Sequence, residues 1–542
     1  MSDDKSTVYE NKSMKDINIA CIFDVFTYAC FKDVCNFIKI KPDSWRETFE
    51  KKDIDFFMIE SVWKGNDGTW ISGRSLVNNK TLKEVIKYCN ENKIPTVFLN
   101  KEDPANFKDF INVAKLFDYI FTSDVNMITE YEKYVDHKNI YPLMFCANPK
   151  THNPIKILNK RIDKSCFAGS FYRESYEQRA ERMKLLLDLA AESTGLDIYD
   201  RNLNLNIEKY KYPDEYNQYI KGNLTQDEIQ IANKGYKIML NVNIVDNSST
   251  MFARRVFEGL ASYTPVISTA SIGVKEVFEG LVIATDNKEK LREEFIKLND
   301  KSYYEEKALK GMRLVLNNHT CLNRMDYILN KLNIDHIYPD LKISIISQVK
   351  NEEEYIRVKE IFENQIYKNK KMFVITNKEL KSKLNTEKDI YIMEEEVLEN
   401  KEKFISLLDA DYVSVIKTEN FYGINYLNDL INATLYSDAE FIGKKCFFTY
   451  NNPTILTKLT GEKIYINNEN QEFEYVSLLD LDKSIFKIDV LKHPSIKDIK
   501  ELLNNNIINL FKFGCRYLSI DKYNFLENGY KASENIKEKI EI

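Results

Sequence analysis

The stretch IMLNVNIVDNSSTMFARRVFEGLASYTPVIS, residues 238–268, decides the fold class of this chain. Residues 238–245 are largely apolar and predict a buried strand, and residues 246–250 are dense in residues that favour turns and helix caps. Residues 251–262 have helical periodicity, and residues 265–268 predict a second short strand. Strand, helix and strand in this order indicate a parallel α/β sheet.

The predicted helix carries two arginines and a glutamate near its start. Arg254 and Arg255 lie on its first turns, and Glu258 follows one turn later. Helix N-termini attract anions, so two guanidinium groups there would clamp a diphosphate, while a carboxylate would bind ribose hydroxyls. The spacing fits equally well a surface ion pair between Arg254 and Glu258, worth ~0.3 to 0.5 kcal/mol. Spacing alone leaves both interpretations open.

The composition is that of a large globular protein with dispersed charge. With 542 residues, 44% hydrophobic and 12% aromatic, the chain is long enough for three domains. Lysine and arginine number 77 and acidic residues 83, a net charge of -6 that gives no electrostatic footprint for nucleic acid. No signal peptide or membrane-spanning apolar stretch is present in the sequence, so we expect a cytoplasmic location.

Cysteine and histidine spacing gives no metal signature. The nine cysteines contain no CxxC pair and no cluster with histidine, so reduced structural thiols are expected rather than disulfides or zinc. The five histidines contain no pair with ligand spacing. His152 and His319 are candidates for contacts with phosphate or acceptor, with a hydrogen-bonded structural role as the alternative.

Residues 1–154 alternate strands and helices, as in a doubly wound α/β domain. Polar residues follow the predicted strands, which span residues 17–23, 55–59, 96–99 and 119–121; these polar residues include Asp24, Glu60, Trp63, Asn100, Lys101, Glu102 and Asp103. Because the carboxyl ends of parallel strands line one crevice, they predict a site for a hydroxyl-bearing ligand, on which Trp63 or Trp70 would stack. The alternative is that Asp and Asn simply favour turns and caps.

A second α/β domain is predicted over residues 155–335, after the boundary signal Asn153-Pro154. Its first strand, residues 165–169, runs into Gly169-Ser170 and a long helix starting near residue 176. This Gly-Ser turn is like half of a phosphate-binding loop. Two such domains in series predict a nucleotide-ligand enzyme with a cleft between them.

Five motifs, in the same order, make residues 16–332 resemble the spore-maturation-type, CgeB-like glycosyltransferases. They are ESVWKG at 60–65, NKEDP at 100–104, HNP at 152–154, FAGS at 167–170 and RRVFEGLA at 254–261. The resemblance implies a GT-B fold and a hexosyltransferase-type reaction that moves a sugar from a nucleotide-sugar donor, with no cofactor and no required metal. The implied acceptor is a glycan, a protein or a cell-surface polymer.

The resemblance also implies roles for individual residues. Donor binding would use Gly169, Ser170, Arg254, Arg255 and Glu258, the last of these on the ribose. The acceptor side would use Trp63, Asn100, Lys101 and Asn153, and the candidates for the catalytic base are Asp24, Glu60, Glu102 and Asp103. Thr250 stands where retaining relatives have a first glutamate, which leaves the stereochemical outcome open.

Residues 336–542 form a third predicted α/β domain that resembles a GT-A glycosyltransferase domain, through Ser347–Asn351, Gln365–Tyr367 and Lys417–Leu427. Its metal-binding acidic cluster is reduced to Glu419 and Asn420, a poor site for a hard cation, because Asp409 and Asp411 precede the next strand rather than end it. We therefore expect a degenerate domain that binds acceptor or acts as a scaffold. For the whole chain, the alternatives to a transferase are a non-catalytic sugar-binding scaffold and a nucleotide-sugar hydrolase or phosphorylase.

Overall fold

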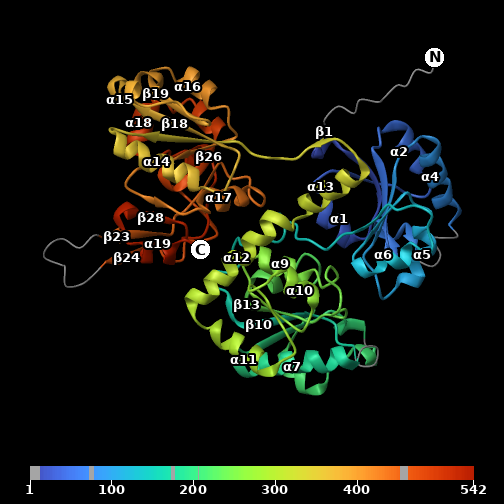
Figure 1. The fold of residues 1–542 in the computed structure, drawn as a ribbon. Helices are drawn as coiled ribbons and strands as arrows, with labels where there is room; N and C mark the ends of the chain where they lie inside the picture. The colour runs from blue at the N-terminus through green and yellow to red at the C-terminus, as the bar shows by residue number, and fades with distance from the viewer. Residues whose placement is uncertain (1–11, 72–78, 173–176, 206, 452–461) are drawn as a thin grey trace, which may run out of the picture. The chain divides into compact units, whose positions relative to one another are not determined.

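The computed structural model describes residues 12–71, 79–172, 177–205, 207–451 and 462–542. The chain divides into two compact units, residues 1–339 and residues 340–542 (Figure 1). Unit 1 contains two six-stranded parallel sheets, and unit 2 contains an eight-stranded mixed sheet and a smaller four-stranded one. The predicted α/β class is therefore confirmed, with two Rossmann-like domains followed by a third α/β domain.

The first sheet of unit 1 has the strand order β3-β2-β4-β7-β8-β9. Its strands are β2 (Asn18–Ile22), β3 (Asn36–Lys39), β4 (Phe56–Glu60), β7 (Thr96–Asn100), β8 (Tyr119–Thr122) and β9 (Ile140–Pro142). The alternating side chains of β4 show how it is covered: Phe57 and Ile59 enter one apolar cluster, and Phe56 and Met58 enter the other. Both faces are buried, which explains the continuous apolar runs in the sequence.

Helices cover both faces of this sheet (Figure 1). One cluster is completed by α2 (Trp45–Lys51), α4 (Lys80–Glu91) and α5 (Phe107–Ala114), and the other by α1 (Val25–Phe31) and α13 (Cys321–Leu332). The last of these comes from the far end of unit 1, because Ala147 pairs with Thr320, the residue that caps α13. A helix from the sequence segment 155–335 thus completes the core of the first sheet.

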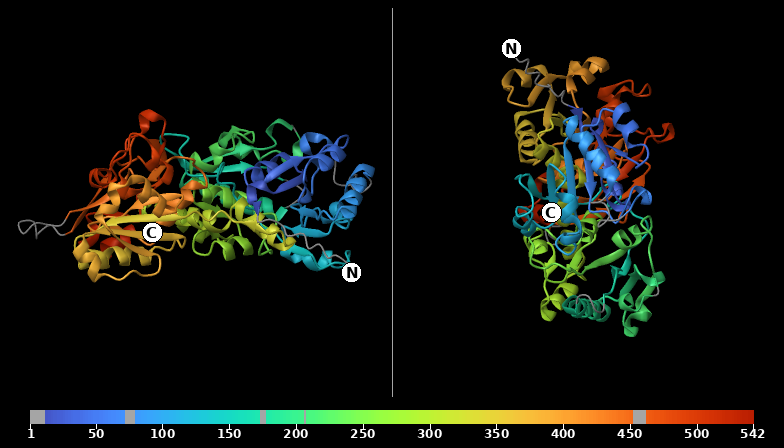
Figure 2. Two further views of the ribbon diagram at one scale, coloured as in Figure 1. Left: turned by 90° about the horizontal axis from the view of Figure 1, so that it is seen from above. Right: turned by 90° about the vertical axis from the view of Figure 1, so that its right-hand side faces the viewer.

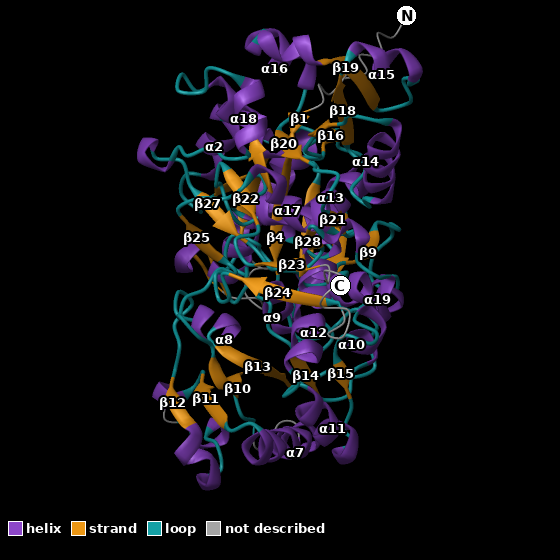
Figure 3. Cartoon of the chain, turned by 90° about the vertical axis from the view of Figure 1, so that its left-hand side faces the viewer, coloured by secondary structure: helices purple, strands orange, loops and turns teal. Residues whose placement is uncertain are grey.

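The second sheet has the order β12-β11-β10-β13-β14-β15, and its strands lie side by side in Figure 3. They are β10 (Ile162–Gly169), β11 (Leu196–Asp200), β12 (Ile220–Gly222), β13 (Tyr236–Asn241), β14 (Val266–Ser268) and β15 (Ile283–Ala284). α7 (Glu177–Ser193) and α11 (Lys288–Lys297) pack in one apolar cluster, and α9 (Arg255–Ala261), α10 (Ile272–Val277) and α12 (Lys301–Asn318) in another. Residue 176, where the first helix was predicted to start, is outside the described residues.

The predicted helix at 251–262 is wrong at its start, because the helix begins at Arg255. Between β13 and α9 the chain makes local hydrogen bonds from side chains to backbone instead of helical ones. Ser248 Oγ accepts from the backbone N–H groups of Thr250 and Met251, and Asn243 Oδ1 accepts from that of Ala253. Such side chains compete with the helix for backbone groups, so the loop extends to Arg254.

Unit 2 begins with four parallel strands, which pair in the order β19-β18-β17-β20. These are β17 (Ile343–Gln348), β18 (Lys370–Thr376), β19 (Ile390–Glu394) and β20 (Tyr412–Val415). The sheet becomes mixed because the next strand, β26 (Ser484–Lys487), pairs antiparallel with β20. Beyond β26 lie β22 (Phe441–Gly443), β27 (Tyr517–Ser519) and β25 (Glu474–Val476). The smaller sheet includes β21 (Phe421–Tyr422), β23 (Phe447–Asn451) and β28 (Phe525–Glu527), which are labelled in Figure 3. Figure 2 gives two further views of the ribbon.

Within the described ranges, no helix combines the length and the apolar character needed to cross a membrane.

Candidate functional site

Arg255 lies against the carboxyl end of β10. Its guanidinium group stacks on the Phe167 ring, with 4.8 Å between Cζ and the ring centroid, and a Cβ atom on Gly169 would come within 3.0 Å of its Nη2. Its Nη1 is buried and has no hydrogen-bond partner in the described part of the chain. Burial lowers the pKa of Arg255 to about 10, so it is still a cation at neutral pH. A cation beside a glycine, with one buried N–H group that is unpaired among the described residues, is suited to bind an anion.

A second buried arginine, Arg179 on α7, lies at the same strand end. Its side chain is 7% exposed and donates a hydrogen bond from Nη2 to the carbonyl of Ser170 at 3.3 Å. Its charge also helps to lower the pKa of Arg255, which means that the two cations are close. Sequence reasoning missed Arg179, although it stands on the apolar face of α7 with Met183 and Leu186, where an arginine is unusual.

Glu258 lies one turn along α9 and has two basic neighbours. Arg254 Nε is 3.3 Å from its Oε1, and His152 Nε2 is 3.8 Å from the same oxygen. The predicted ion pair therefore exists, and it uses only one carboxylate oxygen. The Arg254 guanidinium also lies 4.6 Å from the centroid of the Phe26 ring on α1, which brings this part of α9 against the first domain. Among the described residues no hydrogen bond to Oε2 of Glu258 is formed, so this oxygen can accept one from a ligand.

His152 is fixed in one orientation beside Glu258. Its Nδ1 accepts from the backbone N–H of Asn148 at 3.1 Å, so the neutral ring carries its proton on Nε2, facing the carboxylate. Burial lowers the pKa of His152. His319 instead stacks on Phe257 and its Nδ1 lies 2.9 Å from Arg324 Nη2, and burial lowers its pKa to about 4. His319 is thus structural, whereas His152 belongs to the site.

Three predicted residues of the first domain, Asp24, Glu60 and Lys101, form one polar cluster at the ends of β2, β4 and β7. Lys101 Nζ is 2.5 Å from Asp24 Oδ2 and 2.8 Å from Glu60 Oε2. Glu60 also accepts from Thr27 Oγ1 at 2.5 Å and from the Asp24 backbone N–H. Burial raises the pKa of Glu60 to about 7. Burial also acts to raise the pKa of Asp24, but the positive charge of Lys101 and the hydrogen bonds to the Asp24 carboxylate together outweigh it and hold this pKa below its usual range. Asp24 is partly exposed, so of this cluster it is the carboxylate that solvent or acceptor can reach.

Asn100 and Asp103 of the NKEDP loop turn inward. Asn100 Nδ2 donates to Asp103 Oδ1 and to Tyr131, and Asp103 Oδ2 accepts from Thr122 at 2.6 Å. Asn100 and Asp103 are fully buried, and burial raises the pKa of Asp103 to about 7. Glu102 is partly exposed and accepts from Asn106 at 2.7 Å. Asn100 and Asp103 therefore fasten the loop and do not face solvent.

The predicted aromatic and domain-boundary residues differ in their exposure to solvent. Trp63 is 41% exposed and packs edge-on against Phe110, so its face is available to a sugar. Trp70 is fully buried and donates to the Ile40 carbonyl at 2.8 Å, which makes stacking of Trp70 on a ligand wrong. Asn153 is buried and accepts from Lys234 Nζ at 3.0 Å, a contact that ties the interdomain segment to α8 (Gln230–Lys234).

Glu60 makes the stability of unit 1 depend on pH. Its pKa is raised from 4.5 to about 7 on folding, so the native state binds more protons than the unfolded chain between these values. The free energy of unfolding should then fall as pH rises from 4.5 to 7, by about 3 kcal/mol from this group. In Glu60→Gln the contribution of Glu60 to the slope of unfolding free energy against pH should vanish, while the contribution of Asp103 stays. Urea unfolding at several pH values, read by tryptophan fluorescence, measures it.

Glu47→Gln is the matched control for this experiment. Glu47 is an exposed partner of Lys51, and this ion pair lowers its pKa below 4.5, so it titrates outside the window. The slope of its unfolding free energy against pH should equal that of the wild type. An unchanged slope in Glu60→Gln would contradict the raised pKa.

Thr250, which replaces the expected glutamate, joins the two domains of unit 1. Its Oγ1 accepts from the backbone N–H of Val125 and donates to the carbonyl of Ser123, both at 2.9 Å. Nearby, Ser248 donates to Asp124 Oδ1 at 2.6 Å. Thr250 therefore links the segment before α9 to the first domain.

Thr250→Val should destabilise the contact between the domains. It removes both hydrogen bonds and leaves the Val125 N–H without its partner, at a cost of about 1–3 kcal/mol. Urea unfolding of the full chain, followed by tryptophan fluorescence, measures the change. Thr250→Ser keeps the hydroxyl and should stay near the wild type; equal losses in both variants would point to the methyl group instead.

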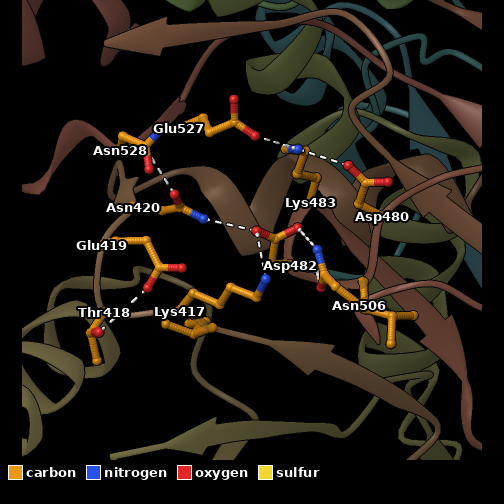
Figure 4. A network of polar contacts seen from close by, with 12 residues as sticks. Lys417, Thr418, Glu419, Asn420, Asp480, Asp482, Lys483, Asn506, Glu527 and Asn528 are labelled. Atoms are coloured by element: carbon orange, nitrogen blue, oxygen red, sulfur yellow. Dashed lines mark hydrogen bonds and ion pairs between the residues drawn. The ribbon is translucent and has the colours of Figure 1, made fainter. Parts of the chain in front are cut away.

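In unit 2 the predicted acidic remnant belongs to a satisfied polar network (Figure 4). Asn420 Nδ2 donates to Asp482 Oδ2 at 2.9 Å, and Asn506 Nδ2 donates to Asp482 Oδ1 at 2.7 Å. Lys417 Nζ lies 3.9 Å from the same carboxylate, while Glu419 contacts Thr418. Sequence reasoning missed Asp482, because it lies 62 residues from Asn420 and no local motif marks it.

Among the described residues, no group of three or more His, Cys, Asp or Glu side chains is arranged to hold a metal ion. Asp409 and Asp411 lie before β20, where Asp409 pairs with Lys342 and Asp411 accepts from its backbone N–H. They are thus at the opposite end of the strand from Asn420, as the sequence predicted.

Comparisons with known proteins place a family match on the second domain. Residues 179–330, less than a third of the chain, match a family described as glycosyl transferase-like, and no curated protein matches. The chain is similar to solved structures of TarM from S. aureus (14% identity, TM-score 0.36), covering 53% of this chain and 58% of TarM. It is also similar to HepE from Anabaena (9% identity, TM-score 0.37), covering 59% of this chain and all of that one. The chain therefore spans just over half of the TarM chain, and likeness at this level carries no argument about activity.

Proposed function

We propose that the chain is a glycosyltransferase that moves a sugar from a nucleotide-sugar donor to a hydroxyl acceptor. The observation that carries this proposal is the Arg255 guanidinium at the carboxyl end of β10, whose buried Nη1 has no hydrogen-bond partner in the described part of the chain. The buried Arg179 adds a second positive charge close to it. A cation whose buried donor has no partner among the described residues can bind an anion, and a diphosphate is the anion of a nucleotide sugar. The family match supports the proposal because residues 179–330 contain both arginines and Glu258.

In this proposal the second domain holds the donor. Arg255 Nη1 and Arg179 bind the diphosphate, and Gly169 lets the backbone of β10 approach it without a side chain. Glu258, fixed through Oε1 by Arg254 and His152, accepts hydrogen bonds from the ribose hydroxyls through Oε2. As the bond to the sugar breaks, negative charge grows on the diphosphate, and the two cations stabilise it as a divalent metal does elsewhere.

The first domain would bind the acceptor. Trp63 offers an exposed ring for stacking, and Lys101 with the partly exposed Asp24 offers polar groups at the ends of β2 and β7. Asp24 and Glu102 are then the candidates for a base that solvent can reach, whereas Glu60 and Asp103 position the loops. We further propose the CgeB-like subtype, and a scaffolding role for unit 2, because Asp482 is occupied by Asn420, Asn506 and Lys417.

A donor panel tests the function. The full chain is incubated with several nucleotide sugars, with and without an acceptor mixture and a chelator, and free nucleotide is measured. Acceptor-dependent release that resists the chelator is the expected result. Release without acceptor would assign a hydrolase instead, and no release from any donor would leave a non-catalytic scaffold.

A further inference from the structure

We propose that Cys30 and Cys146 are a modification site, where a peroxide-class oxidant forms a reversible disulfide. The two Sγ atoms are 3.5 Å apart in the folded protein, although the residues are 116 positions apart in sequence. A disulfide bond is about 2.05 Å long, so the sulfurs must approach by about 1.5 Å for the bond to form. This inference is independent of the proposed transferase activity.

Hydrogen bonds fix the positions of the two segments that carry the cysteines. Asn148 Nδ2 donates to the Ala29 carbonyl at 2.9 Å and to Asp33 Oδ2 at 3.0 Å, which ties α1 to the segment after β9. Arg324 of α13 donates to the carbonyls of Met144 and Phe145, at 3.0 and 3.1 Å. The fold therefore presents the two thiols to each other before any bond forms, so a disulfide costs little rearrangement.

The exposure of the two residues assigns their order of reaction. Cys30 is partly exposed, whereas Cys146 is buried. Peroxide therefore oxidises Cys30 first, giving a sulfenic acid and water. The Cys146 thiol then attacks the Cys30 sulfur, the S–S bond forms, and a second water leaves, so that two thiols and one peroxide give one disulfide and two waters. A dithiol reductant reverses the reaction.

The remaining cysteines give the reaction its selectivity. Six of them are buried, namely Cys21, Cys35, Cys89, Cys166, Cys321 and Cys446, and Cys515 is partly exposed. Within the described ranges, Cys30 and Cys146 are the pair whose sulfurs make contact. Cys515 thus serves as an internal reference for the oxidation, because it is partly exposed but no second thiol among the described residues contacts it to form a disulfide.

The disulfide would close a loop of 116 residues in unit 1 and so restrict its unfolded state. All three tryptophans, Trp45, Trp63 and Trp70, belong to unit 1. Urea unfolding read by tryptophan fluorescence should therefore show a higher midpoint after oxidation. The midpoint should return to its original value on reduction.

Peptide mapping of the full chain tests the proposal. The protein is treated with hydrogen peroxide, quenched with catalase and alkylated after denaturation, with and without prior reduction. The expected result is a linked peptide pair containing Cys30 and Cys146, lighter by about 2 Da than the two thiol peptides and lost on reduction. Cys30→Ala and Cys146→Ala should each abolish it, and Cys35→Ala, a buried neighbour in the same apolar cluster, should keep it.

Two outcomes would overturn the proposal. One is oxidation of Cys515 while Cys30 and Cys146 stay as free thiols; the other is a bond from Cys30 to Cys321 instead. Because the map is made on the wild-type chain, it decides the question even where a variant folds poorly.

Discussion

Arg255→Ala is expected to lower kcat/KM for the nucleotide-sugar donor by about 100-fold, the effect of removing one donor to a developing oxyanion. Arg255 has a buried Nη1 with no partner among the described residues, and it lies at the end of β10 beside Gly169. Its removal takes away the charge that faces the diphosphate of the leaving group. Steady-state kinetics on the donor identified by the panel, together with calorimetry of nucleotide binding, measures the loss.

Two further variants separate the role of Arg255 in binding from its role in packing. Arg255→Lys keeps a charge but loses the planar fork, so we expect a loss of about 10-fold. Arg292→Ala is the matched control, because Arg292 is exposed on α11 and pairs with Glu192 at 3.4 Å. It should leave kcat/KM unchanged. Full activity in a folded Arg255→Ala protein would remove this residue from the donor site.

The pattern of apolar runs was sufficient to predict most strands of the two parallel sheets of unit 1, but not β12, which lies in a segment expected to be helical or mixed. β2, β4, β7 and β8 are buried on both faces, so each reads as a continuous apolar run followed by polar residues. β3 and β9 were not predicted: they are short and lie at the two edges of the first sheet, where one neighbour is missing and the apolar signal is weaker.

The candidate site was predictable only in part, because polar residues at strand ends serve two purposes. Glu60 and Lys101 form an ion pair that the sequence could not show, since it depends on three strand ends that meet in space. Asn100 and Asp103 have the same local pattern but turn inward to Tyr131 and Thr122. Whether such a residue faces ligand or core depends on contacts with residues 19 or more positions away in the sequence.

Lys444 and Asp521 in unit 2 form a fully buried ion pair, and breaking it should be the most destabilising single change that we predict. Lys444 Nζ is 3.1 Å from Asp521 Oδ1 and donates to the Asp521 carbonyl at 3.0 Å, and both side chains are completely inaccessible. Oδ2 of Asp521 has no hydrogen-bond partner in the described part of the chain. Lys444→Met leaves this carboxylate without its cation, which costs about 3–5 kcal/mol.

The two units allow this loss to be assigned to unit 2. All three tryptophans lie in unit 1, so fluorescence reports the unfolding of unit 1, whereas circular dichroism reports both units. Lys444→Met should move one circular-dichroism transition down by about 1–2 M urea and leave the fluorescence transition in place. The double variant Lys444→Met with Asp521→Leu removes both charges and should recover most of the stability, because a buried ion pair replaced by apolar residues of similar size is often no less stable. If the double variant is as unstable as Lys444→Met, the packing of the lysine stem, rather than the unpaired carboxylate, is the cause.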